Sequence, residues 1–171
     1  MLRSTSVKQE SWKPVKLLAK QPVDEYILSL ETDFKGKVAV ALTKNTVNIF
    51  SDRNLLKKID IKNGKKIYIS SISEIIYVLT SQELYCFDYW GNLEWLYSTE
   101  GLIDDFSVDY EGKKIFLQGS NFLIFLSRFG EIEWEYNFDE SIISIHPASN
   151  DLLLVSTINS IFSLGKDRQL T

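Results

Sequence analysis

Few side chains in this 171-residue sequence have the types and spacing that a catalytic or metal site requires. The only histidine, His146, has no second histidine with which to bind a metal or relay a proton, so we interpret it as a structural or solvent-facing residue. The carboxylates of Asp104, Asp105, Asp109 and Glu111 have the chemistry to hold a cation, although exposed acids at strand ends usually remain solvated. We therefore expect no catalytic residue and no bound metal.

The remaining reactive or charged groups are one cysteine and one cluster of lysines. Cys86 lies in an apolar stretch, and as the only cysteine it excludes an intramolecular disulfide, so we interpret it as a small buried hydrophobic residue. The cluster has the charge to contact phosphate or an acidic partner, but lysines also protect sheet edges, and we favour that second interpretation for Lys57, Lys58, Lys62, Lys65 and Lys66. A net charge of −4 and a pI near 5.1 argue against nucleic acid as a partner outside this minor basic patch.

Sequence motifs of enzymes are missing as well. There is no glycine-rich phosphate loop, nucleophile elbow, HExxH pair or calcium loop, so no cofactor is expected. No apolar stretch has the length of a signal-peptide core or a membrane span, from which we expect a soluble, cytoplasmic protein without a membrane partner. The composition, with 44% hydrophobic and 13% aromatic residues and only three prolines, is that of a folded protein rich in strand-forming residues.

The elements that position these residues recur along the chain. Residues 84–97 consist of two apolar runs around a turn, and residues 123–136 repeat that pattern 39 positions later. In both copies a glycine precedes a tryptophan by four positions, as in Gly91 with Trp95 and Gly130 with Trp134. Degenerate copies on either side extend the series, with offsets of 37, 39 and 38 between the equivalent positions Phe50, Phe87, Leu126 and Leu164. A period of this length indicates a repeat architecture.

Each repeat contains short apolar runs separated by turn residues, which predicts four antiparallel strands and therefore the blade of a β-propeller. We predict an all-β domain over residues 12–171 behind a flexible N-terminus over 1–11, with four four-stranded blades at approximately residues 24–62, 63–100, 101–139 and 140–171. Trp95 and Trp134 lie on the apolar face of the last strand of their blades, where we expect them to dock against the neighbouring blade. In the first blade this position falls on Lys58 or, with a slip of one residue, on Ile59.

The glycine–tryptophan repeat resembles that of a known family. Asp88-x-x-Gly91-x-x-x-Trp95, preceded by Leu84-Tyr-Cys-Phe, is similar to the repeat of quinoprotein-type (PQQ-like), tryptophan–aspartate-like β-propellers, and the third repeat has Ser127 in place of the aspartate. The resemblance implies a propeller fold and, as in many such proteins, a scaffold role. It also permits a quinone-dependent dehydrogenase or another ligand-binding propeller. Those enzymes use Ca²⁺ and an acidic catalytic residue, for which this sequence offers no recognisable ligand set, so we expect a protein that is not an enzyme.

Residues 13–19 have the pattern of an outermost blade strand. A shift of 78 positions aligns residues 13–30 with 91–108 without a gap, so that Val15, Leu17 and Ala19 match Leu93, Trp95 and Tyr97. The fourth repeat lacks such a strand, and we predict that residues 13–19 complete the last blade, because an open strand edge favours aggregation. Three assemblies satisfy this prediction: a closed four-bladed monomer, a homodimer that forms one eight-bladed ring, or a hetero-assembly.

The turns between the third and fourth strands of the blades emerge on one face of a propeller, and here they carry aromatic and charged residues. These turns are residues 52–53, 89–90, 128–129 and 166–168. Trp90 at such a tip is either packed onto an adjacent blade or exposed for contact. The residue types match those of interface hot spots, and the predicted partner-binding set is Arg53, Tyr89, Trp90, Arg128 and Phe129. We therefore predict a non-catalytic interaction or assembly scaffold that binds a protein partner or a second copy of the chain.

Overall fold

The computed structural model describes residues 17, 20–148 and 152–165, and this part of the chain consists of fifteen strands and their connections. The strands form four antiparallel sheets, which we call blades 1 to 4. Blade 1 contains β1 (Ser29–Thr32), β2 (Val38–Leu42), β3 (Thr46–Ser51) and β4 (Asn54–Asp60). Blade 2 contains β5 (Lys66–Ser70), β6 (Ile75–Leu79), β7 (Glu83–Asp88) and β8 (Leu93–Ser98). Blade 3 contains β9 (Asp105–Val108), β10 (Lys114–Gln118), β11 (Phe122–Ser127) and β12 (Ile132–Asn137), and blade 4 contains β13 (Ile142–Pro147), β14 (Leu153–Thr157) and β15 (Ile161–Leu164).

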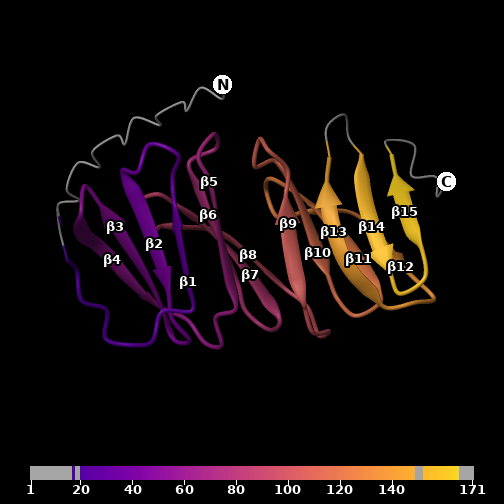
Figure 1. Cartoon of the computed structure of the whole chain (residues 1–171), viewed down its shortest axis with the longest axis horizontal. Coiled ribbons are helices and arrows are strands. Elements are labelled where there is room, and N and C mark those ends of the chain that lie inside the picture. Colours follow the sequence, from indigo (N-terminus) through magenta and orange to yellow (C-terminus); the bar gives the residue numbers. More distant parts are fainter. Residues whose placement is uncertain (1–16, 18–19, 149–151, 166–171) are drawn as a thin grey trace, which may run out of the picture.

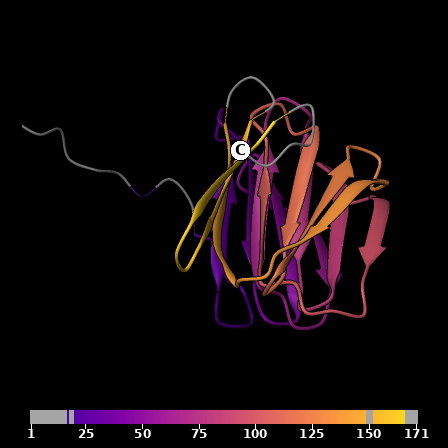
Figure 2. The same cartoon turned by 90° about the vertical axis from the view of Figure 1, so that its right-hand side faces the viewer.

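Each strand within a blade pairs with the next one in the chain, and the blades follow one another in sequence order. Figure 1 shows them as a row that begins with blade 1 in indigo and ends with blade 4 in yellow. Figure 2 looks along this row, with blade 4 nearest the viewer. The predicted all-β class and the four blades of a β-propeller are confirmed. Within the described residues no helix is long and apolar enough to cross a membrane.

Hydrophobic clusters fill the spaces between successive blades, and the strand period of two explains how one strand serves two of them. In β6, Ile76 and Val78 belong to the cluster shared with blade 1, whereas Tyr77 and Leu79 belong to the cluster shared with blade 3. All four side chains are 0–1% exposed. Because successive side chains of a strand point to opposite faces, a strand between two blades must be apolar throughout.

The repeated glycine is explained by the turn between the third and fourth strands. In blade 2, Oδ1 of Asp88 accepts hydrogen bonds from the backbone N–H groups of Trp90 (2.9 Å) and Asn92 (2.7 Å). Gly91 lies between them with a φ of +78°, a left-handed conformation that glycine adopts without strain. In blade 3 the hydroxyl of Ser127 accepts the equivalent hydrogen bonds, and the following glycine has a φ of +79°.

The turn between the third and fourth strands is shorter in blade 1. The residue equivalent to the repeated tryptophan is shifted along the fourth strand as a result. The turn has two central residues, both with positive φ, instead of the longer glycine turn. Lys57 therefore takes the cross-strand position in blade 1 that Trp95 takes in blade 2. The prediction of Lys58 or Ile59 for this position is wrong, because it assumed equal turn lengths in all blades.

Three predicted features lie outside the described residues. They are the flexible N-terminus over 1–11, the closing strand over 13–19 with the exception of Leu17, and the turn at 166–168. The side chain of Leu17 is 77% exposed. The described residues give blades 1 to 3 four strands each and blade 4 three strands.

A candidate binding site between blades 1 and 2

The predicted contact residues lie on one face of the row of blades. This tip face is the end of the blades where first and second strands, and third and fourth strands, are joined. Of the two alternatives for Trp90, the structure has the exposed one: its side chain is 63% exposed, and that of Phe129 is 65% exposed. The guanidinium carbon of Arg128 lies 4.9 Å from the centroid of the Phe129 ring, a distance typical of cation–π contacts.

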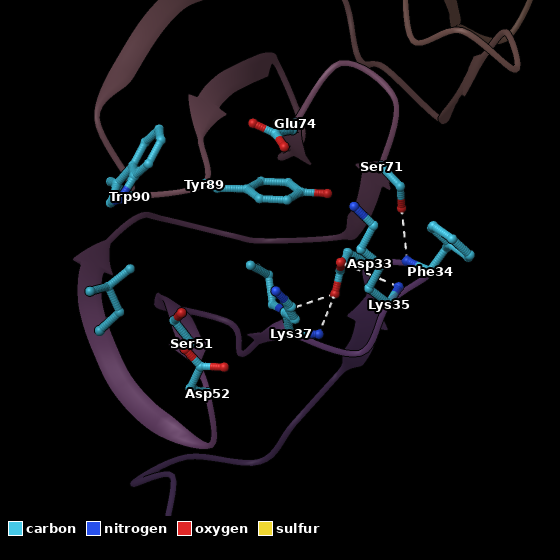
Figure 3. A pocket seen from close by; sticks show the side chains of 12 residues that line it. Asp33, Phe34, Lys35, Lys37, Ser51, Asp52, Ser71, Glu74, Tyr89 and Trp90 are labelled. Carbon is cyan, nitrogen blue, oxygen red and sulfur yellow. Dashed lines mark hydrogen bonds between the residues drawn. The ribbon is translucent and has the colours of Figure 1, made fainter.

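A hollow of about 250 Å³ opens on the tip face between blades 1 and 2. Figure 3 shows its lining side chains, which come from the tip-face turns of blades 1 and 2 and from the adjoining strands β2, β3 and β4 of blade 1. The apolar and aromatic residues of the lining are Phe34, Val38, Leu56, Tyr89 and Trp90. Its polar and charged residues are Asp33, Lys35, Lys37, Ser51, Asp52, Ser71 and Glu74.

The turn between β1 and β2 is held rigid by a buried carboxylate. Asp33 is 6% exposed, and its Oδ1 accepts hydrogen bonds from the backbone N–H groups of Lys37 (2.7 Å) and Val38 (2.8 Å). The next residue, Phe34, donates its backbone N–H to the hydroxyl of Ser71 in blade 2, at 2.9 Å. This bond fixes one wall of the hollow to the other, while the Phe34 ring remains 83% exposed (Figure 3).

Tyr89 and Trp90 provide the aromatic surface on the blade 2 side. The half-buried Tyr89 ring packs against the cluster between blades 1 and 2, and its hydroxyl donates to the carbonyl of Ser70 at 3.4 Å. Burial raises the pKa of the Tyr89 phenol, so this hydroxyl stays protonated and able to donate. In Figure 3 the Tyr89 ring extends towards Ser71, whereas Trp90 stands at the rim.

The charged side chains at the rim carry both signs. Lys35, Lys37, Asp52 and Glu74 are all exposed, and no ion pair joins any two of them. Asp52 and Glu74 also have positive φ values of 47° and 57°, which are strained for residues other than glycine. The rim therefore offers two amines and two carboxylates to a ligand.

An equivalent hollow between blades 2 and 3 is much smaller, at about 80 Å³. There the space is lined by Tyr77 and Trp95, whose rings lie 5.9 Å apart. The strand register gives the equivalent positions of blade 1 to Val40 and Lys57. The larger hollow thus lies beside the blade in which a valine and a lysine take the positions of these two aromatic rings.

The two hollows divide the predicted contact residues. Tyr89 and Trp90 line the larger hollow, Arg128 and Phe129 line the smaller one, and Arg53 lines neither. Sequence reasoning missed Phe34 and Leu56, which are 83% and 46% exposed in the larger hollow. The signal that singled out Trp90 was an aromatic residue in a turn. The turn Asp33-Phe-Lys-Gly36 carries the same signal, which would have identified Phe34.

Four of the five lysines in the predicted basic cluster have separate partners. Lys58 and Lys66 each form an ion pair with an aspartate, at 2.8 and 2.6 Å. Lys65 donates to the backbone carbonyl of Ile103 at 2.8 Å, and Lys57 contacts an asparagine oxygen in blade 2 at 3.5 Å. These contacts join neighbouring blades or hold the segment before β1.

The other residues considered for chemistry are also dispersed. Asp105 pairs with a lysine of blade 2, Asp109 accepts backbone N–H groups of the turn between β9 and β10, and Glu111 pairs with a lysine of that turn. Among the described residues, no group of three or more His, Cys, Asp or Glu side chains is arranged to hold a metal. His146 is exposed on β13, and Cys86 is buried, which raises the pKa of its thiol to about 12.

Neither a protein-family model nor a curated protein sequence matches this chain, but solved structures do. BamB from Moraxella catarrhalis is 14% identical, with a TM-score of 0.66 over 86% of this chain and 52% of that chain. BBS1N, solved in complex with ARL6DN, is 10% identical, with a TM-score of 0.69 over 94% of this chain and 55% of that chain. Both are propellers, and this chain spans about half the length of each. At these identities the similarity establishes the fold.

Proposed function

We propose that this protein is a non-catalytic interaction module that binds an extended segment of a partner protein in the hollow between blades 1 and 2. The observation that carries the proposal is the exposed aromatic rim of Phe34 and Trp90 around the half-buried ring of Tyr89. Tryptophan and tyrosine are enriched among residues that dominate binding energy at protein interfaces. Their rings offer large contact areas with little conformational entropy to lose on binding.

The size of the hollow favours a peptide side chain over a cofactor. Sites for drug-sized ligands and cofactors occupy roughly 300–1,000 Å³, whereas this hollow measures about 250 Å³ and opens to the surface. One large apolar side chain of a partner fits such a space, and the flanking residues of the partner then reach the rim. There they meet two lysines and two carboxylates, which favours a segment with charges of both signs beside its apolar anchor.

The chemistry of the same residues gives no support to an enzyme. The one buried carboxylate, that of Asp33, already accepts backbone N–H groups of its own turn and has no role left as a base. The solved structure of BBS1N as a complex with ARL6DN is an example of a chain with similar fold that binds a protein. We extend the proposed contact along the tip face to Arg128 and Phe129 at the smaller hollow.

The proposal is tested with a random peptide library displayed on phage and selected against the immobilised protein. We expect selected peptides to lose about 30-fold in affinity for Trp90→Ala, the effect of a hot-spot residue worth about 2 kcal/mol. Phe129→Ala should have a smaller effect. Tyr110→Ala is the matched control, because Tyr110 is an 86% exposed aromatic residue in another turn of the tip face.

All three variants should have the melting temperature of the wild type, because these side chains are mostly exposed. Peptides that bind wild type and Trp90→Ala equally well would refute the assignment of the site. A selection that enriches no peptide at all would refute peptide binding.

A further inference from the structure

The blade 1 wall of the larger hollow has no backbone N–H group to spare in its turn between β1 and β2. From Asp33 to Val38 every backbone N–H already donates: three to the Asp33 carboxylate, two to carbonyls of the same turn and one to the Ser71 hydroxyl. The N–H of Asp52, in the other tip-face turn of blade 1, donates to the carbonyl of Lys37 at 3.0 Å. A partner that adds a β-strand needs a row of free N–H and C=O groups. Strand addition to this wall is therefore excluded.

The rim of the hollow disfavours an amphipathic helix. A helix with its side chains is about 10–12 Å wide, and it binds by laying an apolar stripe along an apolar groove. Here the hollow measures about 250 Å³, and its apolar lining is bordered by the exposed charges of Lys35, Lys37, Asp52 and Glu74. A helix that covered the lining with its apolar stripe would bury these charges without partners, which is costly.

The aromatic rings of the hollow are the surface that remains for recognition. Phe34 and Trp90 are mostly exposed, and in the view of Figure 3 the Tyr89 ring lies between them. Tyr89 is held in place by the cluster beneath it and by its hydroxyl bond to Ser70. Grooves lined by such rings bind proline-rich segments, which are already extended as polyproline II helices and lose little entropy on binding. We propose that the hollow binds a proline-rich segment in the polyproline II conformation.

The hydrogen-bonding groups of the hollow match such a segment. The indole N–H of Trp90 has no acceptor among the described residues, whereas that of Trp95 donates to the carbonyl of Arg128 at 2.9 Å. A polyproline II helix has no internal hydrogen bonds, so its carbonyls are open to such a donor. Proline itself has a carbonyl but no N–H, so it brings no donor that the hollow would leave unpaired. The free Trp90 donor and the surplus of ligand acceptors are complementary.

The charged rim then selects the residues that flank the prolines. Lys35 and Lys37 favour an acidic flanking residue, and Asp52 and Glu74 favour a basic one. This assignment rests on the proposed function, because it names the class of segment that the same hollow binds.

The test uses a synthetic peptide of about eight prolines with a glutamate at one end and an arginine at the other. The matched control peptide keeps both charges but replaces the prolines by glycine–serine repeats, which form a flexible coil. Each peptide is titrated into the full ¹⁵N-labelled chain, and the indole N–H peaks of its four tryptophans are followed by NMR. The peak of Trp90 is identified by its absence from the spectrum of Trp90→Phe.

We expect the proline peptide to shift the Trp90 indole peak and the glycine–serine peptide to leave it in place. Trp90→Phe keeps a ring but removes the donor, so it should bind the proline peptide about fivefold more weakly, as measured from the backbone amide peak of Phe34. Tyr110→Ala should bind this peptide as the wild type does, because Tyr110 lies outside the hollow.

A Trp90 peak that does not move with the proline peptide, or that moves equally with both peptides, would overturn the proposal. Peptides from the phage selection separate this failure from that of the site. If they depend on Trp90 but contain no proline, only the class of segment is wrong. If neither they nor the proline peptide depend on Trp90, the proposed function fails as well.

Discussion

Trp95 joins blades 2 and 3, and its replacement by alanine should strongly reduce the stability of the protein. The indole packs 5.9 Å from the ring of Tyr77, and its Nε1–H donates to the carbonyl of Arg128 in blade 3 at 2.9 Å. It also covers Gly130, where an added Cβ would come within 2.7 Å of the ring. One side chain thus contacts its own blade, the next blade and the turn that connects β11 with β12.

The expected magnitude follows from the area of this contact. A buried tryptophan removes roughly 150–250 Å² from water, and because Trp95 is only half-buried we take the lower value. At about 25 cal/mol per Å² the loss is about 4 kcal/mol. The hydrogen bond to Arg128 adds little, because it is exposed and water replaces the indole N–H. We therefore expect Trp95→Ala to reduce the free energy of unfolding by about 3–4 kcal/mol.

The assay is urea unfolding followed by far-ultraviolet circular dichroism, which does not depend on the deleted fluorophore. Trp95→Phe keeps most of the ring contact and should lose only about 1 kcal/mol, so it remains measurable if Trp95→Ala does not fold. Trp134→Ala should resemble Trp95→Ala, because Trp134 packs beside the cluster between blades 3 and 4. Equal unfolding midpoints for Trp95→Ala and the wild type would refute the proposed docking role.

Three further predictions concern glycine, a buried carboxylate and alkaline pH. Gly130→Ala should lower the free energy of unfolding by more than about 1 kcal/mol, because the φ of +79° strains alanine and the new Cβ would collide with the Trp95 ring. Gly165→Ala is the control: no atom lies within 4 Å of its new Cβ, so it should match the wild type in urea unfolding. Asp33→Ala should cost about 2–3 kcal/mol by leaving backbone N–H groups unpaired, and Asp33→Asn about 1 kcal/mol because its amide oxygen still accepts; equal melting of the two variants would contradict this. Burial raises the pKa of the Cys86 thiol from 9.0 to about 12, so the unfolded chain loses this proton first. This contribution to stability is complete below about pH 9 and is lost as the pH rises towards 12; the melting temperature of Cys86→Ala should therefore fall less over this range, and an identical fall would exclude the thiol as a cause.

Much of the fold is predictable from the sequence because each blade is specified locally. The turn of Asp88 and Gly91 needs one carboxylate and one left-handed residue, and the sequence shows them seven and four positions before Trp95. The residue of blade 1 that is equivalent to the repeated tryptophan was not predictable in this way. A turn shorter by one residue transfers it to Lys57, and only the cross-strand pairing reveals that shift.

The sequence by itself determined the repeat, the strand class and the aromatic character of the turn tips, because period and turn chemistry are properties of neighbouring residues. Only the tertiary structure decided that Phe34 and Trp90, 56 positions apart, border one hollow while Phe129 borders another. The physical reason is packing between blades: each hollow is lined by residues of two blades, so the turn residues that share a hollow are fixed only when those blades pack together.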